Sequence, residues 1–330
     1  MEHMKRKRSR AQLASVALLA VLLGTVVLGH ASELGHYAPA LPRIRDFFVP
    51  TPGFHYTQYH FYYTSDTLRD GDGNKIDSLQ VGPLTFDVET DVDAYTVVPA
   101  LVYVAPWQVL GARYGLLVSQ PFGNTTVQAS LEEVTNPEFA LKIDEDGFGL
   151  GDIYVRPLWL GWDLGRGDLA ASYGVYAPSG KFEDGAADNI GLGMWTHEFM
   201  LAGAYYLDRQ RGTALVLAGL YEIHHNKEDV DIRPGSHVTL NYGVSQFLPV
   251  NKTVLGELGV LGYGQWQVTR DSGSDAFNKK VKDRIYGIGL QGSLTYLPWK
   301  AQLSFHWLHE FKAEDRFEGD SFNFTLAMSF

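Results

Sequence analysis

Residues 321–330 read SFNFTLAMSF, and their side chains alternate in character from one position to the next. Successive side chains of a β-strand point to opposite sides, so this segment has one apolar face and one face of small or polar residues. The apolar face needs an apolar medium, either a protein core or lipid. It is made of Phe322, Phe324, Leu326, Met328 and Phe330.

The same alternation recurs along most of the chain and predicts a series of strands. We expect them at 53–64, 88–105, 110–122, 149–163, 167–178, 193–207, 212–226, 236–249, 253–268, 282–297, 299–312 and 317–330. The connections between them alternate in length. Short connections are expected at 106–109, 164–166, 208–211, 250–252 and 298, and long ones at 65–87, 123–148, 179–192, 227–235 and 269–281.

Alternating faces together with alternating turn lengths are typical of a transmembrane antiparallel β-barrel, which has short periplasmic turns and long extracellular loops. We therefore predict an all-β barrel of about twelve strands in the outer membrane of a Gram-negative bacterium. The apolar face that ends at Phe330 is then expected to meet outer-membrane lipid and lipopolysaccharide. We also expect it to be the assembly signal that the barrel-assembly machinery recognises.

The first residues have the plan of a secretory signal peptide. Basic residues at 5–10 precede an apolar run at 16–28, and small residues stand at the two positions that a signal peptidase reads. We expect residues 1–31 to be cleaved off. A membrane anchor retained at 11–28 is the alternative.

Residues 32–52 stand between the signal peptide and the barrel predicted at 53–330. Three prolines in this segment argue against a strand. Its apolar residues are unusual in a disordered tail, so we expect it to enter the lumen as a plug. A loose periplasmic lead is the alternative. These apolar residues are Ile44, Phe47, Phe48 and Val49.

The composition argues against several other classes of protein. The chain has no cysteine, so it is not a disulfide scaffold, and a metal site would have to use histidines and carboxylates. Its formal net charge is −11, which argues against nucleic acid as a partner. We expect no cofactor.

Several motifs point to a family. They are Gly35-His36-Tyr37, Pro52-Gly53-Phe54, YYTSDTLRDGDGNKI (62–76), GLGDIYVRPLWLGWDLG (149–165) and YGVYAPSGKF (173–182). In these motifs the chain resembles the outer-membrane proteins of the putative MetA-pathway of phenol degradation family, over most of its length after the signal peptide. The resemblance implies a transporter related to the hydrocarbon and long-chain fatty-acid uptake barrels. It assigns no chemistry to any residue.

Charged residues within strands are expected to face the lumen, because Arg or Lys facing lipid at mid-bilayer costs about 2–4 kcal/mol. We predict that they form a polar track that shapes permeation. Ion pairs that only stabilise the barrel are the alternative. A bulge at Pro157 would reverse the side to which its neighbour points. The predicted track is Arg113, Arg156, Glu198, Glu222, His224, Glu257 and His306.

Aromatic residues are expected on the same inner face, where they would suit apolar or aromatic solutes. Rings that fill the barrel, or that belong to an interfacial girdle, are the alternative. The predicted aromatic lining is Phe54, Tyr56, Tyr62, Tyr176 and Tyr263.

The loop DGDGNKID (70–77) has oxygen ligands at a spacing similar to that of a calcium-binding loop. It lacks the glutamate at the twelfth position, and strands flank it, so we favour a solvated turn. The candidate calcium ligands are Asp70, Asp72, Asn74 and Asp77.

An enzymatic function is not expected. Ser304 and His306 share one face of a predicted strand, but residues two apart are about 7 Å apart along it, beyond hydrogen-bond reach. Glu222 and His224 with His225 suggest a metal site, yet the two histidines would point to opposite faces.

These features predict an outer-membrane channel for passive uptake of small hydrophobic or aromatic compounds, with a small apolar solute as its ligand. The alternative is a structural or adhesive barrel that acts through its acidic loops and transports nothing. An outer-membrane hydrolase is a third and weaker alternative.

Overall fold

The structure is a computed structural model that describes residues 34–135, 140–186, 188–276 and 279–330. The predicted signal peptide at 1–31 lies outside the described residues. Within these ranges, every regular element apart from one short 3-10 turn at Leu297–Trp299 is a β-strand, and the strands belong to one antiparallel sheet. No helix among the described residues is long and apolar enough to cross a membrane.

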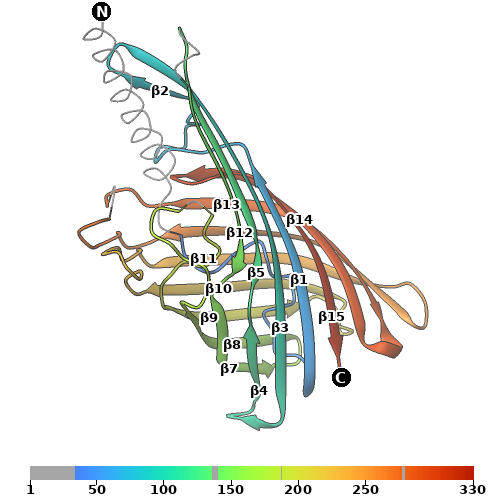
Figure 1. Ribbon diagram of the computed structural model, residues 1–330. Coiled ribbons are helices and arrows are strands. Elements are labelled where there is room, and N and C mark those ends of the chain that lie inside the picture. Colours follow the sequence, from blue (N-terminus) through green and yellow to red (C-terminus); the bar gives the residue numbers. More distant parts are fainter. Residues whose placement is uncertain (1–33, 136–139, 187, 277–278) are drawn as a thin grey trace, which may run out of the picture.

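The sheet closes into a barrel, because the first barrel strand pairs with both β3 and the last strand, β15. Figure 1 shows the strands wrapped around a common interior. The barrel strands are β1 (Gly53–Ser65), β3 (Leu84–Val109), β4 (Ala112–Ser119), β7 (Ile153–Asp163), β8 (Gly167–Ala177), β9 (Thr196–Tyr206), β10 (Thr213–His224), β11 (His237–Pro249), β12 (Val254–Gln267), β13 (Arg284–Tyr296), β14 (Ala301–Glu314) and β15 (Asp320–Ser329). This is the predicted barrel of twelve strands.

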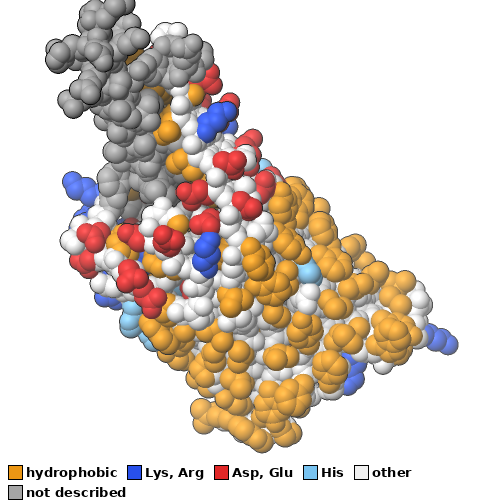
Figure 2. All heavy atoms as spheres, viewed as in Figure 1, with side chains coloured by type: hydrophobic (Ala, Val, Ile, Leu, Met, Phe, Trp, Pro, Cys, Tyr) orange, Lys and Arg blue, Asp and Glu red, His pale blue; other side chains and the backbone are white. Residues whose placement is uncertain are grey.

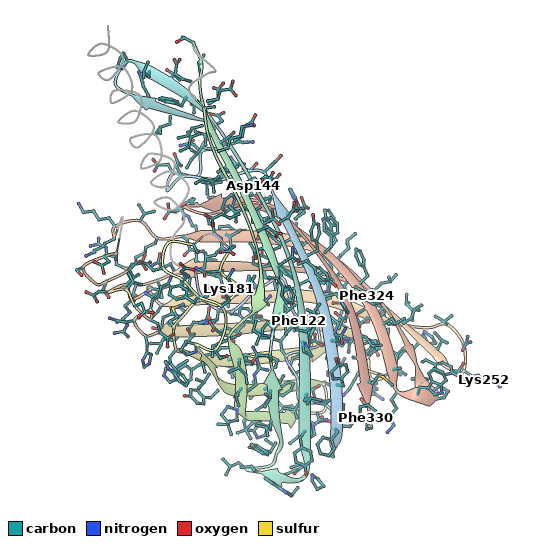
Figure 3. The ribbon with its side chains drawn as sticks, in the orientation of Figure 1. Phe122, Asp144, Lys181, Lys252, Phe324 and Phe330 are labelled. Atoms are coloured by element: carbon teal, nitrogen blue, oxygen red, sulfur yellow. The ribbon has the colours of Figure 1, made fainter. Side chains whose placement is uncertain are left out.

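Alternation along each strand separates an inner from an outer face. On β10, Leu215 and Leu217 are exposed on the outside, while Val216 and Ala218 between them are buried inside. Phe322 on β15 is likewise exposed, as are Phe324 and Phe330, which are labelled in Figure 3. Figure 2 shows the result: hydrophobic side chains cover the wall of the barrel in this view, and charged side chains gather at one end.

One part of the barrel continues beyond its rim as an extension, which rises at the top of Figure 1. Strand β3 pairs with β4 in one half and with β5 (Phe122–Glu133) in the other. Strand β5 pairs with β6 (Ala140–Leu150), and β2 (Ser78–Val81) pairs with the start of β3. A small apolar cluster around Phe86, Val88 and Leu131 packs on this extension.

The extension corrects the predicted long loop at 123–148, which is mostly strand, and the loop at 65–87, which contains β2. Charged residues such as Asp144, labelled in Figure 3, hide the alternation in β6 because both of its faces are largely accessible to water. These strands form because β2 and β5 hydrogen-bond to the long strand β3, and β6 in turn hydrogen-bonds to β5. The first short turn lies at Leu110–Gly111 rather than at 106–109, and both residues have the positive φ that a tight hairpin needs.

Residues 34–52 lie inside the barrel, and we call them the inner segment. Ile44, Phe47 and Val49 are buried in the same apolar cluster as inward-facing residues of β3, β7, β9, β10 and β12. Side chains from strands on several sides of the barrel also hydrogen-bond to the segment. The inner segment therefore occupies part of the lumen and contacts its wall on several sides.

Candidate functional site

A cavity of ≈ 360 Å³ lies between the inner segment and the wall formed by β1, β3, β4 and β7. It remains on this side because the inner segment is bonded to strands on the opposite side of the lumen. Most of its lining is apolar. The apolar side chains include Phe47, Phe61, Val98, Ala100, Leu117, Ile190 and Leu192.

The charged groups beside the cavity are already paired. Arg156 donates a 3.2 Å bond to Glu198, and it also donates to the Tyr154 hydroxyl, which in turn donates to Glu198 at 2.6 Å. Asp46 of the inner segment accepts bonds from Arg43 and from the Tyr59 hydroxyl at 3.0 Å. Buried charges need such partners. Because each charge already has one, neither group favours the binding of a charged ligand.

A third polar group closes the cavity at the end of the barrel with the long loops. His36 is 2.8 Å from the carboxylate of Asp152, which lies between β6 and β7 and also accepts backbone N–H bonds from Leu192 and Gly180. Burial alone would raise the pKa of Asp152, but these hydrogen bonds hold it below its ordinary value. The His36 ring stacks on Tyr176 with centroids 4.6 Å apart.

The opposite side of the inner segment is held by a polar wall. Arg45 pairs with Glu257 at 2.8 Å, and the backbone N–H of Ile44 donates to Gln291 at 3.0 Å. The carbonyl oxygen of Ala40 accepts from Asn323 at 3.0 Å and is 2.8 Å from His306. The segment is thus bonded to β12–β15 and leaves its free space toward β1, β3 and β4.

The structure places all the residues of the predicted polar track on the inner side, including Arg156 beside the irregular pairing at Pro157. It does not bring them together as one track. Arg156 with Glu198, Glu257 with Arg45, and His306 with Ala40 are separate contacts. Arg113 donates to the backbone oxygen of Pro50, at 3.4 Å. Glu222 and His224 lie near the long-loop end, with Glu222 bonded to the backbone N–H of Tyr37.

Of the predicted aromatic lining, the structure places two residues on the inner side of the barrel and three on the outer side. Tyr176 lines the cavity and Tyr263 is buried inside. Phe54 and Tyr62 are 62% and 39% exposed on the outside, and Tyr56 shares their face. The reason is that both faces of β1 are rich in aromatic residues, so alternation alone could not show which one points inward. The inner rings of β1 are Tyr59, Phe61 and Tyr63.

The loop at 70–77 forms a turn around Asp70. Its carboxylate accepts backbone N–H bonds from Asp72 at 2.9 Å and from Asn74 at 2.8 Å, and Gly73 has a positive φ of 84°. Aspartate side chains that accept hydrogen bonds from backbone N–H groups a few residues further along the chain are common in turns. No three acidic or histidine side chains of this loop gather their ligand atoms at one point among the described residues.

Ser304 and His306 are not arranged as a hydrogen-bonded pair. No hydrogen bond joins them among the described residues, and the Nε2 atom of His306 faces the Ala40 carbonyl oxygen.

Comparison with known proteins gives a family and a fold. The model of the family described as "Putative MetA-pathway of phenol degradation" matches residues 57–326. Among solved structures, the chain is similar to the COG4313 outer membrane channel from Pseudomonas putida F1, with a TM-score of 0.69 and 13% identity over 88% of this chain and 100% of that one. A search of curated proteins finds no match.

Two further barrels align less well. The β domain of the Bordetella autotransporter BrkA gives a TM-score of 0.47 at 9% identity, covering 85% of this chain and 100% of that one. A FadL homologue from Pseudomonas aeruginosa gives 0.32 at 9% identity, covering 84% and 89%. The fold is thus that of a twelve-stranded outer-membrane barrel, of the kind seen in the channel from P. putida.

Proposed function

This chain belongs to the "Putative MetA-pathway of phenol degradation" family, and we propose that it is an outer-membrane channel for the passive uptake of small hydrophobic or aromatic compounds. The observation that carries the proposal is the apolar cavity of ≈ 360 Å³ beside the inner segment. Sites for small organic molecules are mostly apolar and occupy about 300–1,000 Å³.

The charges around the cavity support an uncharged solute. Arg156 and Asp46 each have a bonded partner within the barrel, so a charged ligand would have to lose its water without gaining a free counter-charge. An aromatic ring meets Phe47, Phe61 and Leu117 instead. A solute with one hydroxyl group would also find hydrogen-bonding partners at the tyrosines of the cavity.

The alternative function is a structural or adhesive barrel that transports nothing and acts through its external surface. The acidic extension offers such a surface, with Asp91 and Asp144 among its exposed charges. The two functions differ in one measurable property, because only a channel speeds the passage of a solute through the membrane.

The test is the uptake of naphthol and of a small sugar into liposomes that carry the refolded protein. Protein-free liposomes give the background, since naphthol also crosses lipid. We expect faster naphthol uptake with the protein and little uptake of sugar. Ala100→Trp, which fills the cavity, is expected to remove most of the increase.

The neighbouring Leu101→Trp is the matched control. Leu101 is 63% exposed on the outer face of the same strand, so a ring there meets lipid and should leave uptake unchanged. Equal effects of the two substitutions, or no increase with the wild-type protein, would refute the proposal. Retained folding of both variants is checked by their mobility on gels before and after heating.

A further inference from the structure

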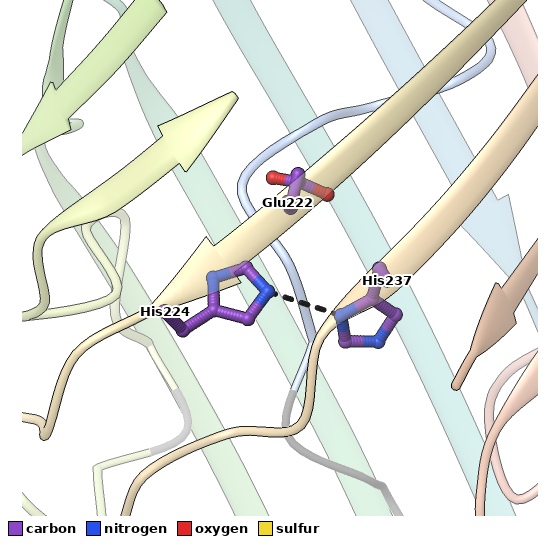
Figure 4. Close-up of side chains that lie close together, drawn as sticks. All are labelled: Glu222, His224 and His237. Carbon is purple, nitrogen blue, oxygen red and sulfur yellow. Dashed lines mark hydrogen bonds between the residues drawn. The ribbon is translucent and has the colours of Figure 1, made fainter. Parts of the chain in front are cut away.

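The hairpin of β10 and β11 brings three side chains with metal-ligating atoms together inside the barrel (Figure 4). Glu222 and His224 are two residues apart on β10 and so share its inner face. His237 is the first residue of β11 and pairs directly opposite Glu222. One ligand atom from each of the three lies within 4.8 Å of the others, the only such group among the described residues.

We propose that Glu222, His224 and His237 bind a divalent metal ion of the Zn²⁺ type at the long-loop end of the lumen. Two imidazoles with one carboxylate suit Zn²⁺ and its neighbours in the first transition row, whereas Ca²⁺ and Mg²⁺ prefer oxygen ligands. This assignment does not depend on which solute the barrel carries.

Each of the two imidazole rings points one nitrogen toward the other ring. His224 Nε2 and His237 Nδ1 are 3.1 Å apart, the dashed line in Figure 4. Zn–N bonds are about 2.0–2.1 Å long, so an ion bonded to both nitrogens would make an angle of about 100° between them, close to tetrahedral. One carboxylate oxygen of Glu222 lies within 4.8 Å of a ligand nitrogen of each ring, so Glu222 can supply the third ligand.

The outer nitrogens of both rings are held in place by partners. His237 Nε2 is 3.0 Å from the carboxylate of Asp283, which is itself paired with Arg316 at 2.8 Å. This contact keeps the proton on Nε2 and leaves the Nδ1 lone pair pointing at the site. His224 Nδ1 is 2.8 Å from the hydroxyl of Thr196. Metal-binding histidines characteristically have a carboxylate or another oxygen on the far nitrogen.

Glu222 supplies an independent observation that points to a cation. Its side chain is 1% exposed, and its Oε2 atom has no hydrogen-bond partner among the described residues. A buried carboxylate oxygen without a partner is costly, and a cation would satisfy it. The other oxygen, Oε1, accepts the backbone N–H of Tyr37 at 2.9 Å.

That last contact connects the site to the inner segment. The same carboxylate bonds to Tyr37 and packs against Gly35, where even a methyl group would come within 2.5 Å of Oε2. Thr196, the partner of His224, also lies 2.7 Å from His36. An ion at this site would therefore hold the segment 35–37 in place at its outer end.

The test is titration of the tag-free, refolded protein, with its inner segment, by Zn²⁺ in a calorimeter. We expect about one ion per chain, as one three-residue site predicts. His237→Gln and Glu222→Gln are expected to abolish this binding. Asp283→Asn removes the carboxylate that holds the His237 ring and pairs with Arg316, without removing a ligand, and should weaken binding by about 10–100-fold. Gel mobility before and after heating shows whether each variant has folded.

His225→Gln is the matched control. His225 is next to His224 but exposed on the other face, where its ring lies 3.1 Å from that of His197. Binding that disappears with His225→Gln and persists with His237→Gln belongs to this exterior pair and would overturn the proposal. No Zn²⁺ binding by the wild-type protein would also overturn it, because the two buried rings then simply share a proton.

A second measurement tests the link to the inner segment. Trypsin cleavage after Arg43 and Arg45 requires the segment to leave the lumen, so Zn²⁺ should slow cleavage in the wild-type protein and have no effect in His237→Gln. If Zn²⁺ binds but does not slow cleavage, the link is refuted.

Visible absorption of the Co²⁺-loaded protein tests the ligand set. It should show the strong bands of a tetrahedral site, and weak octahedral bands would contradict the ligand set.

Discussion

The two sides of the lumen treat the inner segment differently. On the side of β10–β15, the segment forms hydrogen bonds and an ion pair with the strands through Tyr37, Ala40, Ile44 and Arg45. Toward β1, β3 and β4 it leaves a cavity lined mostly by apolar side chains. One side therefore fixes the segment, and the other provides room for a solute. The difference shows that a barrel can hold a segment of its own chain and still keep an apolar cavity beside it.

The largest effect is expected from deleting residues 34–52. The deletion removes the contacts of the segment on both sides of the lumen. Water can then reach the polar side chains that bonded to it, and the lumen opens. We expect single-channel conductance and sugar uptake in liposomes to rise severalfold. A barrel that is closed by other means would show unchanged conductance, which would contradict the assignment of the segment as the main obstruction.

Removing one side chain of the inner segment that bonds to the polar side should cost much stability. Arg45→Ala leaves Glu257 buried without its cation, and removal of one partner of a buried ion pair costs about 3–5 kcal/mol. Urea unfolding of the barrel in lipid vesicles measures the change. Arg209→Ala, at an exposed turn position, is the control and should change the free energy of unfolding little.

A packing contact on the same side should have an intermediate effect. Ile44 lies over Gly259, where a methyl group would come 2.4 Å from its terminal carbon. Gly259→Ala therefore forces Ile44 to move, and overpacking of this kind costs about 1–3 kcal/mol.

Shortening Ile44 sharpens that measurement. Ile44→Val removes the clashing carbon, so the double variant should recover part of the loss in the free energy of unfolding. Gly203→Ala, where no atom lies within 4 Å of the added methyl group, should be nearly neutral. Additive effects of Gly259→Ala and Ile44→Val would contradict the contact.

The smallest effect is expected on the cavity side. Tyr59→Phe removes the 3.0 Å bond to Asp46, which still keeps its bonds from Arg43. A single hydrogen bond of this kind contributes about 1 kcal/mol. A loss as large as that of Arg45→Ala in the same urea assay would show that both sides hold the segment equally.

The candidate site could be predicted only in part. Charges such as Glu198 and Glu257 could be placed inside because lipid excludes them. The inner rings of β1 could not, since Tyr56 and Tyr62 on one face look no different in sequence from Tyr59 and Tyr63 on the other. Phe61, which lines the cavity, was missed for that reason.

The sequence by itself determined that the chain forms an outer-membrane barrel, and it determined the approximate number of strands. Turn lengths can be read locally, and so can the alternation of residues, because lipid on one side of the wall requires apolar side chains at every second position. Only the tertiary structure decided which face of β1 points inward, how 123–148 pairs, and where residues 34–52 lie. It alone brought His237 opposite Glu222 and Asp283 against His237. These are contacts between distant segments, set by strand register and by what fills the lumen, and no local pattern of residues encodes them.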